Sequence, residues 1–362
     1  MQGLDLIVKR SVLNEAELVP FDVLEPPEAG TALLRIDQFA LTANNITYAV
    51  APNLMRYWEF FPVDREGWGR VPVWGFADVA ASAHPEVAVG RRVFGYFPMS
   101  SHLVIRPTQV SAYTMTDASE HRQPMSPFYN QYSFTDHDPT WTAEGEAMIS
   151  LFRPLFTTSF LLDDLHRSNG FFDAGRVILS SASSKTAMAL AHLLAAGGKV
   201  EVVGLTSAGN VGFVEGLGCY DRVLAYGDLE SLPCEPACFV DMAGNADLLR
   251  RVHEHLADDL KNSCRVGLTH WQSLEGEVKG MPGPRPEFFF APGYAQQRLD
   301  DWGRAAFLER TGVAWAQFVD TGAQWIHVVA DTGPEAALAR YNAMLGGKVD
   351  PAEGLILSLQ PG

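Results

Sequence analysis

The chain has 362 residues, of which 47% are hydrophobic and 19% are charged, a composition that suits packed cores and differs from that of disordered proteins. Its length exceeds the common domain size of about 100 to 200 residues, so two domains are expected. The 27 basic and 43 acidic residues give a formal net charge of -16. This charge argues against nucleic acids and membrane surfaces as partners, since binding to phosphates needs clustered Lys and Arg.

The first residues contain no long apolar stretch of the kind found in signal peptides, and no apolar run approaches the length of a membrane-spanning helix. We therefore expect a cytoplasmic protein. The four cysteines lack paired C-x-x-C spacing, so free buried thiols are favoured over disulfides or a zinc cluster.

Short strand signals dominate the first hundred residues. Apolar runs such as "TALLRIDQFAL" and "VPVWGFADVAAS" are separated by Gly and Pro at short intervals. Residues from about 107 to 150 show no sustained period but contain many aromatic side chains, which argues against simple disorder. This part predicts a mainly β, barrel-like domain with an aromatic-rich insertion that lines a pocket or a subunit contact.

The pattern changes at about residue 151. "LFRPLFTTSFLLDDLHRSNG" predicts a helix that ends at Asn169 and Gly170. Short apolar runs then alternate with helix-length segments, which is typical of a parallel sheet covered by helices. A long helical stretch is expected from about 298 to 321, followed by a strand, a helix and a strand that return to the first domain. The expected domains are residues 1–150 with 325–362, and residues 151–324.

Residues 176–198, "RVILSSASSKTAMALAHLLAAGG", read as strand, turn of small residues and helix, the order of a dinucleotide-binding unit. The turn has none of the glycines of the G-x-G-x-x-G fingerprint. Serine hydroxyls and the first amides of a helix can still donate to an anion, and a lysine can add positive charge. The alternative is an ordinary strand-to-helix turn capped by serine. The predicted cofactor contacts in this turn are Ser181, Ala182, Ser183, Ser184, Lys185 and Thr186.

The next strand ends in "GLTSAGN", residues 204–210, without the acidic residue that binds the ribose 2′-hydroxyl in NAD sites. The neutral donors Thr206, Ser207 and Asn210 therefore favour NADP(H) over NAD(H). Ligands of open α/β sheets bind beyond the carboxyl ends of the strands. Ala243 and Gly244, after one strand, and Leu268 and Thr269, after another, are predicted neighbours of the ribose and nicotinamide, with ordinary loops as the alternative.

Several segments resemble the medium-chain dehydrogenase/reductase superfamily. They are "ALTANNITYAV" at 40–50, "VPVWGFADVAASAHPEVAVGRRVFGY" at 71–96, "ASSKTA" at 182–187 and "GPEAALARYNAMLGGKVDPAEGLILSL" at 333–359. The set "YNQY", "LFTTSFLLDD" and "SSASSKTA" is most similar to an uncharacterised bacterial domain-of-unknown-function family within or near that superfamily. The resemblance implies an α/β protein, with a GroES-like β-barrel domain and a Rossmann-like doubly wound parallel sheet, and by analogy a homodimer.

Zinc enzymes of the superfamily carry Cys in the first of these segments and His-Glu in the second. Here the nearest positions hold Asn44 and Trp74–Gly75, so no metal is expected. Without zinc, the substrate oxygen must be polarised by hydrogen bonds, and a neutral phenol can donate one. In zinc-free enoyl reductases of this superfamily, an early tyrosine has that role.

Tyr48 is accordingly the first catalytic candidate, with Asn44 as its neighbour and Tyr129 as a rival. Tyr57 and Tyr132 are candidates for the substrate pocket. Thr158 lies on the helix that borders the nicotinamide pocket in the superfamily. A purely structural role remains the alternative for each of these residues.

These observations predict a zinc-independent oxidoreductase that transfers hydride between NADP(H) and an activated C=C or C=O bond of a small organic substrate. The alternative is a Rossmann scaffold that has lost redox turnover and serves as a binding or assembly protein, or as a non-redox enzyme. The two hypotheses differ in whether the glycine-free turn binds a dinucleotide, because hydride transfer depends on that binding.

Overall fold

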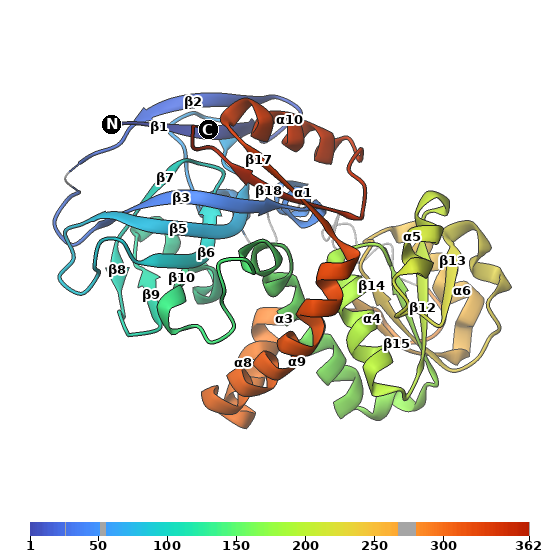
Figure 1. Cartoon of the computed structure of the whole chain (residues 1–362). Coiled ribbons are helices and arrows are strands. Elements are labelled where there is room, and N and C mark those ends of the chain that lie inside the picture. The colour runs from blue at the N-terminus through green and yellow to red at the C-terminus, as the bar shows by residue number, and fades with distance from the viewer. Residues whose placement is uncertain (26, 51–55, 267–279, 362) are drawn as a thin grey trace. The chain divides into compact units, whose positions relative to one another are not determined.

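The computed structural model describes residues 1–25, 27–50, 56–266 and 280–361. It divides into two compact units, which we describe separately (Figure 1). The first unit is Met1–Leu151 together with His327–Gly362, and the second unit is Phe152–Ile326. The chain therefore leaves the first unit once and later returns to it.

The first unit is built mainly from strands. Strands β1 (Gln2–Lys9), β2 (Ala16–Asp22) and β4 (Trp68–Gly69) form a small sheet in the order β2-β1-β4. A nine-stranded sheet runs in the order β17-β18-β3-β5-β6-β10-β9-β8, with β7 paired to β3. Its strands are β3 (Ala32–Leu41), β5 (Pro72–Ser82), β6 (Arg92–Pro98), β7 (His102–Ile105), β8 (Pro107–Thr108), β9 (Thr114–Asp117), β10 (Gln131–Phe134), β17 (His327–Thr332) and β18 (Glu353–Ser358).

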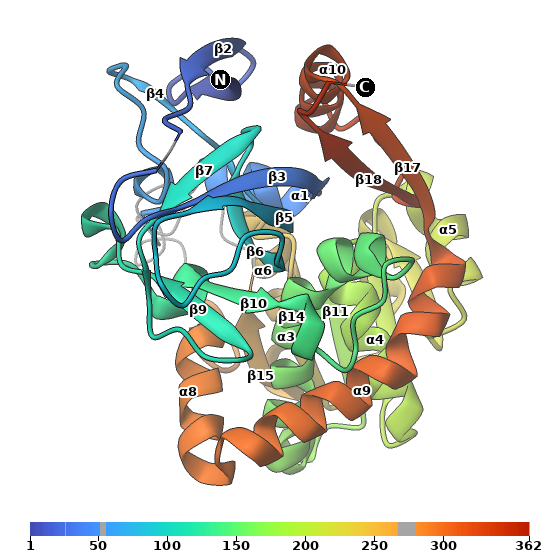
Figure 2. The ribbon, with the colours of Figure 1, turned by 60° about the vertical axis from the view of Figure 1, so that its left-hand side comes forward.

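The last strands complete the sheet of the first unit. Strand β18 pairs antiparallel with β3, with Leu355 opposite Leu41, and β17 runs parallel to β18. Helix α10 (Pro334–Leu345) packs against both strands, as Figure 2 shows. Strands β17 and β18 and helix α10 therefore belong to the first unit.

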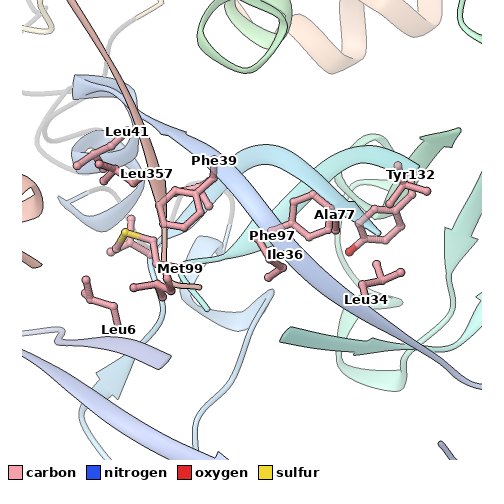
Figure 3. Packing of buried hydrophobic residues seen from close by; sticks show 14 of the residues in the cluster. Leu6, Leu34, Ile36, Phe39, Leu41, Ala77, Phe97, Met99, Tyr132 and Leu357 are labelled. Atoms are coloured by element: carbon pink, nitrogen blue, oxygen red, sulfur yellow. The ribbon is translucent and has the colours of Figure 1, made fainter. Parts of the chain in front are cut away.

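The hydrophobic core of the first unit lies between its strands (Figure 3). Every second side chain of a strand points to the same face, so Leu34 and Ile36 of β3 enter the core together. Phe97 of β6 and Tyr132 of β10 lie side by side there, with ring centroids 5.3 Å apart. The early apolar runs are therefore strands that share one core.

The insertion is more regular than its sequence suggests. Residues 107–150 contain the short strands β8, β9 and β10, and β10 extends the large sheet beside β6. In β9 and β10 every second residue is buried, but each strand is only four residues long. Such short strands give no sustained period, which is why the sequence predicted none.

The second unit contains a parallel sheet of six strands in the order β13-β12-β11-β14-β15-β16. The strands are β11 (Arg176–Ser180), β12 (Glu201–Thr206), β13 (Arg222–Ala225), β14 (Ala237–Asp241), β15 (Leu260–Arg265) and β16 (Glu287–Phe288). This is the strand order of a dinucleotide-binding fold, and the order reverses between β11 and β14. Ligands of such sheets bind at the carboxyl ends of the strands beside this reversal.

Helices connect these strands. They are α3 (Glu146–Ser168), which carries the chain in from the first unit, α4 (Lys185–Gly197), α5 (Val211–Gly216), α6 (Ala246–Leu256), α8 (Ala291–Trp302) and α9 (Arg304–Trp325). Because β11-α4-β12 and β14-α6-β15 step in opposite directions across the sheet, right-handed crossovers place α4 and α6 on opposite faces. None of the helices in the described ranges is long and apolar enough to cross a membrane.

Three element boundaries differ from expectation. The helical stretch near 298–321 is two helices separated at Gly303, whose φ of 78° cannot continue a helix. Strand β15 lies at Leu260–Arg265, where polar residues hide the apolar pattern that would mark a strand. Strand β16 has only two residues, and both are exposed.

Candidate functional site

The turn between β11 and α4 keeps the geometry of a glycine turn without glycine. Ser181 has a φ of 50°, a left-handed conformation that glycine adopts more readily than other residues. Its carbonyl accepts from the amide of Ser184, 2.7 Å away, and its own amide donates to the Tyr226 hydroxyl at 3.1 Å. These hydrogen bonds hold Ser181 in a backbone conformation that glycine adopts at less cost.

Close packing of the turn depends on a glycine in the neighbouring strand. Ala182 is fully buried, and its amide donates to the carbonyl of Leu205 in β12. A side chain at Gly204 would come within 3.0 Å of the Ala182 Cβ and 2.9 Å of the Tyr220 ring. Gly204 therefore leaves the space that Ala182 and the Tyr220 ring occupy.

Helix α4 begins directly after the turn. Ser184 is its N-cap, and the Ser184 hydroxyl accepts from the amide of Ala187 at 3.3 Å. Lys185 is the first helical residue and is half-buried, and burial lowers the pKa of its ammonium group to about 8. A helix N-terminus with a lysine on its first turn favours an anionic ligand.

The structure brings the predicted residues of β12 to this turn. The Asn210 side-chain amide donates to the Ser183 hydroxyl at 3.0 Å. Thr206 is buried at the end of β12, and Ser207 is exposed directly after it. From α3, the Ser159 hydroxyl donates to the Thr186 carbonyl at 2.7 Å, and Thr158 precedes Ser159 on this helix.

A buried carboxylate, Asp241, lies at the reversal of strand order. The Ser180 hydroxyl donates to its Oδ1 at 2.8 Å, and the amides of Ala243 and Gly244 donate to the same oxygen. Burial raises the pKa of Asp241. Ala243 and Gly244 are therefore at the carboxyl edge of the sheet, held by Asp241. Leu268 and Thr269 lie outside the described residues.

A second cluster of candidate residues lies in the first unit. We call it the aromatic cluster, and it comprises Tyr48, Tyr57, Phe60, Trp74, Phe94, Tyr96, Phe128 and Tyr129. Tyr48 on α1 (Ala43–Val50) lies 4.3 Å from Tyr57 and 5.9 Å from Tyr96 between ring centroids. The hydroxyls of Tyr57 and Tyr129 are 3.4 Å apart. The cluster thus brings together three of the four predicted tyrosines.

Local contacts fix Tyr48 in this cluster. The side-chain amide of Asn44, one helical turn earlier, donates to the Tyr48 hydroxyl oxygen at 2.6 Å. Asn45 ties α1 to β5 by donating to the carbonyl of Pro72 at 2.8 Å. Burial, and then the neighbouring Tyr129, raise the pKa of Tyr48. The phenol is therefore neutral, and its proton is available for donation.

Tyr132, the fourth predicted tyrosine, has a different environment. It is fully buried in the hydrophobic core beside Phe97 (Figure 3). Its hydroxyl accepts from Arg122 at 2.8 Å and donates to the carbonyl of Tyr96 at 3.1 Å. Both hydrogen-bonding roles of this hydroxyl are used within the protein.

Four residues of these sites were missed in the sequence. Tyr226 and Asp241 contact the serine turn, and Trp74 and Tyr96 belong to the aromatic cluster. Asp241 was visible only as a polar residue at a strand end, and Trp74 as the replacement for a zinc ligand. Tyr226 and Tyr96 carried no signal, because their partners are distant in sequence. Within the described ranges no group of three or more His, Cys, Asp and Glu side chains is arranged to hold a metal.

Solved structures share this fold along the whole chain. CurA from Vibrio vulnificus, in complex with NADPH, is 14% identical with a TM-score of 0.59, over 99% of this chain and 100% of its own. The CurK enoyl reductase is 13% identical with a TM-score of 0.59, over 99% of both chains. The yhdH oxidoreductase from Salmonella enterica, in complex with NADP, is 14% identical with a TM-score of 0.53, over 99% of this chain and 100% of its own.

These likenesses confirm the expected fold class, with a GroES-like domain and a Rossmann-like domain, as in the medium-chain dehydrogenase/reductase superfamily. Among curated protein sequences, no relative matches the chain. A family model described as "Protein of unknown function (DUF2855)" matches residues 39–350. The chain therefore belongs to this family.

Proposed function

We propose that the protein is a zinc-independent, NADP(H)-dependent oxidoreductase that transfers hydride to or from an activated C=C or C=O bond of a small organic substrate. The observation that carries this proposal is the left-handed Ser181, because it gives the glycine-free turn a backbone conformation that glycine would otherwise supply. The fold shared with structures that hold NADPH and NADP supports the same cofactor class.

The residues at the turn fit a phosphorylated dinucleotide. The N-terminus of α4 and the Lys185 ammonium would hold the diphosphate. Thr206, Ser207 and Asn210 would receive the ribose end, where a carboxylate would repel a 2′-phosphate. NADP(H) is therefore favoured over NAD(H). When bound, the nicotinamide supplies or accepts the hydride.

The aromatic cluster provides the chemistry at the substrate. Because Asn44 donates to the Tyr48 oxygen, the phenol must direct its own proton elsewhere, and a substrate oxygen is a suitable acceptor. The raised pKa of Tyr48 keeps that proton on the phenol at neutral pH. Tyr48 would thus polarise the substrate oxygen, as zinc does in metal-dependent relatives. Asn44 and Trp74–Gly75, at the positions nearest to the zinc ligands of those relatives, support zinc independence.

One observation favours the alternative of a scaffold without redox turnover. The Ser181 amide already donates a hydrogen bond to the Tyr226 hydroxyl. This amide is one of the donors that a diphosphate would use. A dinucleotide would have to displace this contact. If the contact persists, the second unit binds no dinucleotide and serves another purpose.

The test is a fluorescence titration of the purified protein with NADPH and NADH. We expect tighter binding of NADPH, and a loss of about tenfold or more in Lys185→Ala, because one charge-assisted contact to phosphate is removed. Lys199→Ala, which removes an exposed lysine after the same helix, is the matched control and should bind normally. Absence of binding by either nucleotide at sub-millimolar concentration would contradict the proposal.

A further inference from the structure

Strand β17 is the last strand of the large sheet in the first unit, and its outer edge is open. It pairs with β18 on one side, and no other strand in the described ranges pairs with it (Figure 2). An edge strand presents a row of N–H and C=O groups that a further strand can bind. Native proteins usually protect such edges by keeping them short or by placing proline or charged residues on them.

Other edge strands among the described residues are short or protected. Strands β4, β8 and β16 have two residues each. Strand β13 has four residues and begins with the exposed Arg222. Strand β2 is seven residues long, but it contains Pro20. Strand β17 has six residues, HVVADT, without proline, lysine or arginine, so it lacks these forms of protection.

The hydrogen bonds to β18 show which groups of β17 face the open edge. The His327 amide donates to the Ala352 carbonyl, directly before β18, at 2.8 Å. Successive amides of a strand point to opposite sides. The amides of Val328, Ala330 and Thr332 therefore point away from β18. We call these three residues the edge row.

The side chains of the edge row are also uncovered. On one face of β17, Asp331 accepts from Arg340 of α10 at 2.6 Å, and Val329 packs against the core of the first unit. Because successive side chains of a strand alternate between faces, those of the edge row lie on the face opposite α10. All three are exposed.

The edge row is complementary to a reversed copy of itself. Valine and threonine have nearly the same shape, and both favour strands. The edge row therefore reads as branched, small, branched in either direction. An antiparallel second copy can place Ala330 opposite Ala330 of the partner subunit, and Val328 opposite Thr332 of the partner subunit. Each such pair can exchange both of its N–H···O bonds, as in any antiparallel ladder.

The charges beside the edge row also fit a second copy. The net charge of -16 makes copies of the chain repel each other, so a contact between them needs a neutral surface. The edge row is uncharged, and Arg340 neutralises the neighbouring Asp331. In the antiparallel arrangement, His327 would be the diagonal neighbour of Asp331 of the partner subunit. An imidazole N–H can donate to that carboxylate.

We propose that β17 is the contact surface for a second copy of this chain, whose own β17 pairs with it antiparallel about a two-fold axis at Ala330. The large sheets of two first units would then continue into each other. A single strand pair buries less surface than a standard interface, so we expect a dissociation constant of roughly 1 to 100 μM. The inference is independent of the proposed function, because neither the serine turn nor the aromatic cluster takes part.

Sedimentation velocity of the full-length protein tests the association. We expect a monomer–dimer equilibrium between about 1 and 200 μM protein. Ala330→Lys would bring two ammonium groups face to face on the axis and should weaken association at least about tenfold. Val104→Lys is the matched control, because it adds the same charge at a 47% exposed position of β7, another strand of the first unit. This variant should associate as the wild type does.

Cysteine cross-linking tests the register and does not depend on the lysine variant. The background is Cys234→Ser, since the other three cysteines are buried. Mild oxidation of Ala330→Cys should give a covalent dimer, because the axis places the two Cα atoms about 5.5 Å apart, within reach of a disulfide. Thr332→Cys should cross-link far less, because it would lie opposite Val328 of the partner subunit.

Three results would overturn the inference. The first is a protein that stays monomeric over the whole concentration range. The second is a dimer that Ala330→Lys does not weaken, since the copies would then meet through another surface. The third is equal cross-linking of Ala330→Cys and Thr332→Cys, which would exclude the two-fold axis at Ala330.

Discussion

The serine turn of the second unit and the aromatic cluster of the first unit differ in how their polar groups are hydrogen-bonded. At the turn, Ser180, Ser181 and Ser183 form hydrogen bonds with side chains from other elements. In the aromatic cluster, the Tyr96 hydroxyl is buried and has no hydrogen-bond partner among the residues that the structure describes. The first arrangement fixes a backbone shape that glycine would otherwise provide, whereas the second leaves a buried hydroxyl unpaired.

This difference predicts that substitutions at the turn will affect folding first, while substitutions in the aromatic cluster will affect function first. The largest expected effect follows from Asp241→Ala. It removes the acceptor of the Ser180 hydroxyl and of two backbone amides, and should lower the free energy of unfolding by about 3 kcal/mol. Urea denaturation measures this loss.

Asp241→Asn keeps an acceptor oxygen and should cost only about 1 kcal/mol. Asp258→Ala, at an exposed aspartate of the same unit, should be neutral. Equal stability of the Asp241→Ala variant and the wild type would show that the turn does not depend on its partners.

The next largest effect concerns Tyr48 and presupposes the proposed function. Tyr48→Phe removes the phenolic donor and should lower kcat about 100-fold with little change in KM, since the donor acts on charge that develops in the transition state. Steady-state kinetics with an enone substrate measures both constants.

Tyr341→Phe removes the hydroxyl of another buried tyrosine of the first unit, which donates to the Leu13 carbonyl, and should leave kcat unchanged. A full-rate Tyr48→Phe variant would instead point to Tyr129 as the donor.

A pH titration sharpens the role of Lys185 at the turn. The pKa of Lys185 is lowered to about 8 by burial, so its ammonium group is present at pH 7 and is lost in the free protein as the pH rises above 8. NADPH affinity should therefore fall about tenfold between pH 7 and pH 9, because a bound phosphate needs the charged form. In Lys185→Ala this dependence should disappear, and its persistence would assign the titration to another group.

The smallest expected effect is a gain in affinity for NADPH. Tyr226→Phe frees the Ser181 amide from its contact with the phenol, and should tighten NADPH binding about threefold by making a donor available to phosphate. Calorimetry measures the change. Weaker binding would mean that the Tyr226 hydroxyl itself contacts the nucleotide.

The sequence predicted the elements of both sites better than their contacts. The order strand, turn and helix around Ser181 was recognisable from small residues and apolar runs. The contact between Ser181 and Tyr226 joins residues 45 apart, and that between Ser180 and Asp241 joins residues 61 apart. No local pattern encodes such pairs, because they depend on the strand order of the folded sheet.

In the aromatic cluster too, residues close in sequence were predicted, whereas contacts between distant strands were not. Tyr48 and Asn44 were identified from one segment, and they are one turn apart on a single helix. Trp74 and Tyr96 meet only through the register of β5 and β6. A sequence reveals that both strands are apolar, but it does not reveal which residues of the two strands stand opposite each other.

The pairing of β18 with β3 has a consequence for synthesis on the ribosome. Strand β3 emerges early, but β18, which covers its end from Phe39 to Leu41, is made more than three hundred residues later. Until then that edge of β3 offers unpaired backbone groups to any neighbouring strand. The second unit can finish folding in the meantime, since all of its residues have been made. The unit that is translated first should therefore be completed last, and its nascent form should be the stage most prone to aggregation.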